Sequence, residues 1–151
     1  MAEMIDWRNL PVYRDTRFAN LEERLCSTKG ANKSGTSIFK TVKELMVFAA
    51  LVGYQLDEYK PLDAAVNKTD ILLGTYATTM DDAYIYLIAL TKNPSLDILK
   101  DDNLRDAIRI FEGYCNGGLK TIDSWIMSNI GEPLLANVLF NQTLGFLVEN
   151  E

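Results

Sequence analysis

The chain contains no histidine, so acid–base or metal chemistry would depend on its carboxylates and its two cysteines. The densest carboxylate pairs are Asp81–Asp82 and Asp101–Asp102. A metal-dependent enzyme would need such groups to converge from separate segments. Each pair falls instead where a helix is expected to begin, and acidic side chains stabilise helix N-termini. We therefore predict that these aspartates are helix caps, that the chain holds no metal or cofactor, and that it is not an enzyme.

The cysteines and glycines also argue against an active site. Cys26 and Cys115 form no CxxC pair, which indicates two reduced, buried thiols. Cys115 falls on the apolar face of its predicted helix and has no histidine to activate it. The glycine-rich patterns of phosphate-binding loops are absent, and Gly117–Gly118 follow a predicted helix rather than preceding one. We expect neither cysteine catalysis nor nucleotide binding.

Charge is distributed unevenly along the chain. The net charge is -6, so the molecule as a whole repels nucleic acid and anionic lipid. Residues 1–40 nevertheless carry seven basic and five acidic side chains. Phosphate contacts by this basic front would make the chain a DNA-binding module, and the alternative is ordinary solvated charge. The candidate DNA-contacting residues are Arg14, Arg17, Lys29 and Lys33.

Apolar spacing and capping signals predict an all-α protein with six or seven helices. We expect one folded domain, in which residues 1–36 form an arm, a first helix and a mobile loop, and residues 37–151 form the helical body. Two apolar runs, 45–52 and 83–90, predict enclosed central helices. The segment 70–76 fits either an extended piece or a single turn. The predicted helices cover residues 16–26, 41–53, 79–90, 101–116 and 119–128, with a last one beginning at Pro133.

Three segments resemble the family of DNA phosphorothioation-associated protein 4, which accompanies the Dnd systems that place sulfur in the DNA backbone and restrict unmodified DNA. The segments are Ser37 to Tyr54, Ala83 to Leu90 with Asp97 to Leu99, and Ile108 to Leu119. The resemblance implies a place in a bacterial anti-phage defence system and implies no reaction. Within the third segment, we expect Asn116–Gly117–Gly118 to end a helix and Glu112, Tyr114 and Asn116 to form an exposed protein-contact patch.

These observations favour an accessory or adaptor protein that contacts other proteins of a DNA sulfur-modification and restriction system. The alternatives are a DNA-binding module that uses the basic arm and, with less support, a metal-dependent enzyme. No apolar run approaches the roughly 20 residues that cross a bilayer, and residues 1–10 do not read as a secretory signal. We therefore expect a cytoplasmic protein with no membrane contact, and a homo-oligomer is compatible with the sequence.

Overall fold

The computed structural model describes residues 6–29, 37–131 and 135–149. The structure is 68% helical, and its described residues contain six α-helices and a small two-stranded sheet. Short 3-10 turns connect several of these elements. In chain order the main elements are β1 (Pro11–Asp15), α1 (Ala19–Leu25), α3 (Val42–Gln55), β2 (Lys68–Leu72), α4 (Leu73–Ala77), α5 (Asp82–Lys92), α6 (Leu104–Ser128) and α7 (Leu135–Glu149).

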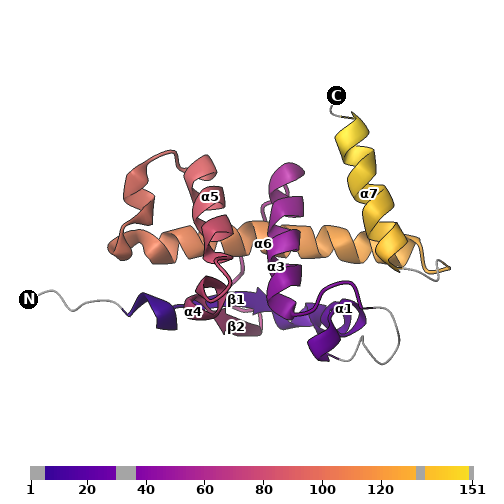
Figure 1. Ribbon diagram of the computed structural model, residues 1–151, viewed down its shortest axis with the longest axis horizontal. Coiled ribbons are helices and arrows are strands. Elements are labelled where there is room, and N and C mark those ends of the chain that lie inside the picture. The colour runs from indigo at the N-terminus through magenta and orange to yellow at the C-terminus, as the bar shows by residue number, and fades with distance from the viewer. Residues whose placement is uncertain (1–5, 30–36, 132–134, 150–151) are drawn as a thin grey trace, which may run out of the picture.

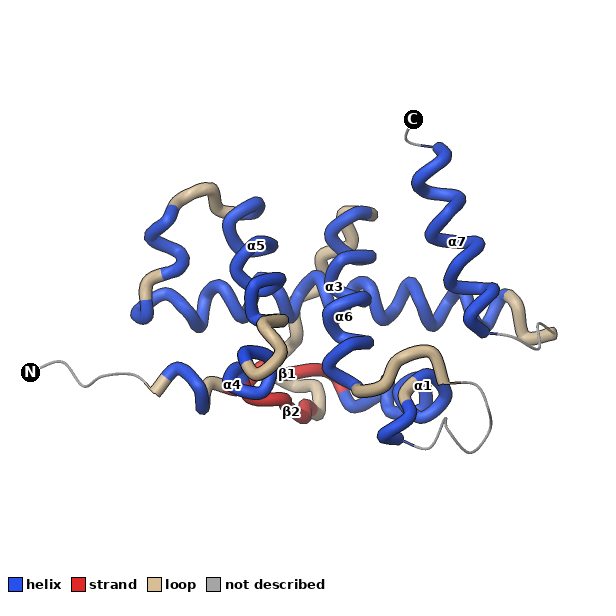
Figure 2. Tube along the Cα trace, viewed as in Figure 1, coloured by secondary structure: helices blue, strands red, loops and turns tan. Residues whose placement is uncertain are grey.

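Helix α6 organises the fold. Its 25 residues give it a length of about 37 Å, and it runs along the long axis of the molecule (Figure 1). Helices α5, α3 and α7 meet it in turn from one end to the other, while β1, β2 and α1 lie along its other side (Figure 2). Its middle is enclosed from Phe111 to Leu119, where every residue is buried. The middle of α6 is therefore enclosed by the elements that surround it.

Glycines allow α3 to cross α6 at very short range. A Cβ atom at Gly118 would lie 1.7 Å from the carbonyl oxygen of Ala49, and one at Gly53 would lie 2.0 Å from that of Tyr114. Gly117 comes equally close to the backbone of Glu58. The prediction that Asn116–Gly117–Gly118 end a helix is wrong, because these glycines serve close packing within one continuous helix.

Only one of the two runs predicted as enclosed helices is mostly buried. In α3, the residues from Leu45 to Val52 are buried except Phe48, which is partly buried, and Leu51, which is 39% exposed. In α5, only Ile85, Ile88 and Ala89 are buried. This helix packs one face on α6 and leaves Tyr84 and Leu87 exposed, at 39% and 58%.

The prediction of an all-α protein is confirmed in broad terms, and a small two-stranded sheet that it did not include accompanies the helices. Strands β1 and β2 pair antiparallel, with Tyr13 opposite Asp70. Val12 and Arg14 are buried on β1, so the inward face includes an arginine. That charge hides the period-two alternation by which a strand is normally recognised. The open reading of residues 70–76 is also settled, since β2 ends at Leu72 and α4 begins at the next residue.

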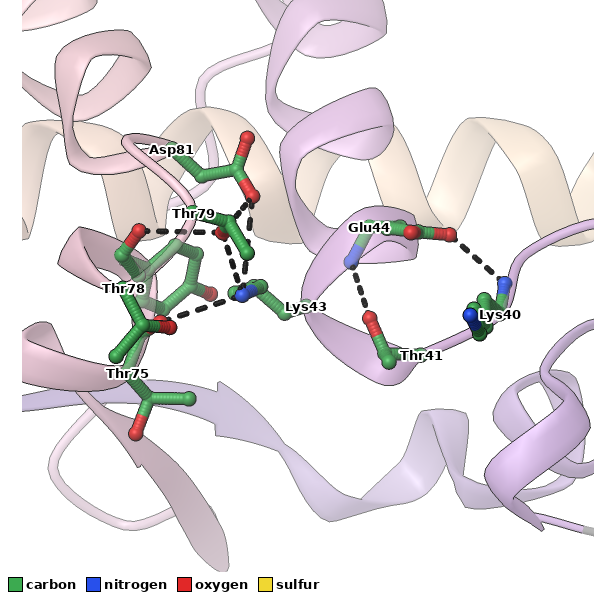
Figure 3. A network of polar contacts seen from close by, with 9 residues as sticks. Lys40, Thr41, Lys43, Glu44, Thr75, Thr78, Thr79 and Asp81 are labelled. Atoms are coloured by element: carbon green, nitrogen blue, oxygen red, sulfur yellow. Dashed lines mark hydrogen bonds and ion pairs between the residues drawn. The ribbon is translucent and has the colours of Figure 1, made fainter.

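The predicted start of the helix over residues 41–53 is confirmed, with Thr41 as its N-cap. The Thr41 hydroxyl accepts from the Glu44 N–H at 3.3 Å, and the Glu44 carboxylate reaches back to the Lys40 N–H at 2.8 Å, as Figure 3 shows. The helix continues past Gly53 to Gln55. Of the helices in the described part of the chain, none is both long enough and apolar enough to cross a membrane.

Candidate functional site

Glu112 lies on α6 beneath β1, and its Oε2 accepts a 2.7 Å hydrogen bond from the Tyr13 N–H. Only 8% of its surface is exposed. Burial raises the pKa of Glu112 to about 7, although the Tyr13 N–H and the charges of Lys68 and Arg109 act in the opposite direction. The prediction that Glu112 is exposed is wrong, because the unpredicted strand β1 covers this face of α6.

A small pocket opens beside the Glu112 carboxylate. Its volume is about 270 Å³, and Leu10, Pro11 and Ile108 form its apolar walls. Arg105, Arg109 and Tyr13 complete the lining. Positions 105, 108, 109 and 112 follow one stripe of α6 because they are three, four and seven residues apart. The arrangement sets a buried carboxylate next to two cationic side chains.

Tyr114 and Asn116 are also buried, at 3% and 7% exposure. The Tyr114 ring packs against the rings of Tyr54 and Tyr59. The Asn116 Nδ2 donates to the Lys60 carbonyl oxygen at 2.9 Å. Both side chains therefore fix the segment that follows α3 against α6. Because β1 and this segment cover Glu112, Tyr114 and Asn116, the predicted exposed contact patch does not exist as a surface.

Two of the four candidate DNA-contacting residues can be placed by their side chains. Arg14 is 8% exposed and forms a two-pronged pair with Glu22, at 2.9 and 3.2 Å. That pairing excludes the phosphate contact expected of Arg14. The Arg17 side chain is 60% exposed and forms an ion pair with Asp15 at 3.1 Å. Lys33 and the side chain of Lys29 lie outside the described residues.

The Asp81–Asp82 pair serves the fold, although not as the predicted side-chain cap. Lys43 Nζ donates to the Thr79 hydroxyl at 2.6 Å and to the Thr75 carbonyl at 3.2 Å, and lies 3.8 Å from Asp81. The Thr79 hydroxyl in turn donates to Asp81 at 2.6 Å, and Figure 3 shows the network. It ties the start of α3 to the turn before α5. The described residues contain no cluster of three or more potential metal ligands.

An apolar groove lies where α3, α6 and α7 converge. Its volume is about 320 Å³. Leu51 and Tyr54 of α3 line it at about 40% exposure each. The other lining residues are Phe48, Val52, Gln55, Leu56, Trp125 of α6 and Thr143 of α7, and none of the eight carries a charge. We call this the α3–α7 groove; it combines apolar surface and a concave shape.

Helix α7 leaves much of its apolar surface uncovered. Leu135, Val138 and Leu139 are buried against the body. Beyond Leu139, no α7 side chain that the structure describes is buried, and Phe140 and Leu144 are 65% and 44% exposed. The helix projects from the end of α6 (Figure 1). The sequence predicts a last helix in this region but not the groove, because the groove depends on how three distant segments meet.

The comparisons with known proteins agree with the sequence resemblance. The family model of DNA sulphur modification system-associated protein 4 matches residues 16–142. The match therefore includes every helix from α1 to α6 and the first half of α7. No curated protein and no solved structure matches the chain. The chain therefore belongs to the family of DNA sulphur modification system-associated protein 4.

Proposed function

We propose that this protein is a cytoplasmic accessory protein of a DNA sulphur modification system, and that it binds another protein of that system through the α3–α7 groove. The observation that carries the proposal is the lining of that groove. Eight residues without a charge form a concave surface in a chain of which 24% is charged. Exposed concave apolar surface on a folded domain is typical of protein-interaction sites.

The proposed occupant is an amphipathic helix of the partner. Helices form the walls of the groove, and a volume of about 320 Å³ has room for a few anchor side chains rather than for a folded domain. Recognition of this kind uses apolar anchors spaced along one face of a helix. Trp125 and Tyr54 supply the aromatic surface that contributes strongly to such interfaces.

The groove fits this role better than the basic arm fits DNA binding. Arg14 is neutralised by Glu22 inside the protein, and Arg17 is paired with Asp15. The net charge of -6 opposes association with nucleic acid over longer distances. Association through an uncharged groove is insensitive to that net charge.

The test is a binding titration of the purified chain against each purified protein of the same modification system. We expect one of them to bind, and Leu51→Glu to weaken that binding at least about tenfold because it places a charge in the groove. Leu87→Glu is the matched control, since Leu87 is 58% exposed on α5 and does not line the groove. Equal binding by the Leu51→Glu variant and the unmodified chain would refute the proposal.

Sedimentation of the chain alone separates this role from self-association. We expect a monomer at the concentrations of the titration. A dimer that Leu51→Glu dissociates would assign the groove to a second copy of this chain and contradict the adaptor role.

A further inference from the structure

The pocket beside Glu112 is lined by charged and polar side chains that have no part in the proposed function. Glu112 is 8% exposed as a residue, and the Tyr13 N–H donates to its Oε2. Among the described residues, Oε1 has no hydrogen-bond partner. A carboxylate oxygen that borders a pocket accepts hydrogen bonds from whatever donor enters it.

The two arginines of the pocket, Arg105 and Arg109, lie at different distances from Glu112 along α6. Arg109 is one turn before Glu112 and Arg105 is two turns before it, so their backbones lie about 4.5 and 10.5 Å from that of Glu112 along the helix axis. Arg109 pairs with Asp106 at 3.3 Å. Arg105 forms no ion pair within the described part of the chain, so it is the group available for an anion.

The ligand must therefore carry hydrogen-bond donors at one end and a negative charge at the other. A free amino acid is too short, because its ammonium and carboxylate are attached to the same carbon. An inorganic anion is too small to reach both the carboxylate and Arg105. A nucleotide has both features at the required separation, with donors on the base edge and a phosphate beyond the sugar.

We propose that the pocket between β1 and α6 binds a single unpaired guanine nucleotide, with the base edge at Glu112 and the phosphate at Arg105. Guanine places two N–H donors, N1 and N2, side by side, and a carboxylate can accept both, here at the unengaged Oε1 and at the second lone pair of Oε2. Thymine offers a single N–H between two carbonyl oxygens, which a carboxylate repels. The apolar walls formed by Leu10, Pro11 and Ile108 suit the base, as pockets that hold an unstacked base commonly do.

This site differs from the phosphate-binding loops that the sequence lacks. Its phosphate would be held by an arginine side chain rather than by glycine-rich backbone. The expectation from sequence that the chain binds no nucleotide was based only on the absence of those glycine-rich loops. The pocket could not be predicted from the sequence, because it forms only where β1 packs beside one face of α6.

The test measures binding of guanosine, adenosine, cytidine and thymidine 5′-monophosphates by calorimetry. We expect guanosine monophosphate to bind at least about tenfold more tightly than thymidine monophosphate. Inosine monophosphate, which lacks the N2 donor, should bind about tenfold more weakly than the guanosine compound. A second arm compares oligothymidylates with and without one 5′-terminal guanine nucleotide. Tighter binding of the guanine-ended strand than of the free nucleotide would identify single-stranded DNA as the source.

Three variants connect this binding to the pocket. Glu112→Gln keeps an acceptor for the Tyr13 N–H but replaces the other oxygen by a donor, so the preference for guanine should be lost. Arg105→Gln should weaken all four nucleotides about tenfold. Arg24→Gln is the matched control, because Arg24 is exposed on α1 and does not line the pocket. Circular dichroism and thermal melting establish that each variant is folded.

Two results would overturn the proposal. The first is the absence of saturable binding of every nucleotide and oligonucleotide at millimolar concentration. The second is binding without base preference that Glu112→Gln leaves unchanged or that Arg24→Gln weakens as much as Arg105→Gln does. Neither result bears on the α3–α7 groove, so this proposal and the adaptor role can fail separately.

Discussion

Replacement of Gly118 by alanine should destabilise the protein strongly, because α3 and α6 cross at this residue. A Cβ at Gly118 would lie 1.7 Å from the Ala49 carbonyl oxygen and 3.0 Å from the Gly53 nitrogen. Both atoms belong to the α3 backbone and cannot move as a flexible side chain does. The two helices must separate by more than 1 Å to restore ordinary contact, and a gap of that size removes about half of the dispersion energy across it.

The magnitude follows from two opposing terms. Overpacking of this kind costs about 3 kcal/mol or more, whereas alanine gains about 1 kcal/mol over glycine inside a helix. We therefore expect a net loss of about 2–4 kcal/mol in the free energy of unfolding. For a chain of this length, the melting temperature should fall by roughly 5–15 °C.

Gly145→Ala is the matched control for that measurement. Gly145 is also helical, on α7, but a Cβ there meets no other atom within 4 Å. Alanine should therefore raise the stability by up to about 1 kcal/mol. Urea unfolding followed by circular dichroism measures both variants. A Gly118→Ala protein that unfolds at the same urea concentration as the unmodified chain would refute the close crossing of α3 and α6.

Three further predictions concern buried polar groups. Burial raises the pKa of Glu112 from 4.5 to about 7. The contribution of this side chain to stability is therefore complete below pH 4.5 and is lost as the pH rises through 7. Glu112→Gln should remove about 2–3 kcal/mol of this pH dependence, measured by urea unfolding at pH 4.5 and 8. Arg14→Met should cost about 3–5 kcal/mol because it leaves Glu22 buried without its partner, and Arg14→Met with Glu22→Leu should recover most of that loss; failure of the double variant to recover would contradict this. Burial raises the pKa of the Cys115 thiol well above its usual range, so an aromatic disulfide reagent should label it only after unfolding in urea, and rapid labelling of the native protein would show that the thiol is accessible.

Local signals in the sequence predicted most of the helices. Thr41 and Glu44 mark the start of α3, and Pro94 follows the end of α5 at Lys92. These features depend on residues within one or two turns of each other, so spacing along the chain is sufficient to find them. The apolar stripe of α6 and the burial of Cys115 were predictable for the same reason.

Features that depend on distant segments were missed. Gly117 and Gly118 were predicted to end a helix because glycine usually terminates helices. In the structure, their lack of a Cβ allows the backbone of Glu58 and Ala49 to pack closely against α6. Glu112 read as exposed because a charged side chain usually is, and nothing near it in sequence indicates that β1 covers it. Both errors arise from contacts between residues more than fifty positions apart.

The most direct test of the central claim is hydrogen exchange of the chain, measured by mass spectrometry with and without the system protein that it binds. The adaptor account predicts slower exchange of backbone amides in residues 51–55 of α3 and 140–145 of α7, which border the groove, and no change in β1. Unchanged exchange in both helices, or protection confined to β1 and the N-terminal turn of α6, would contradict the account.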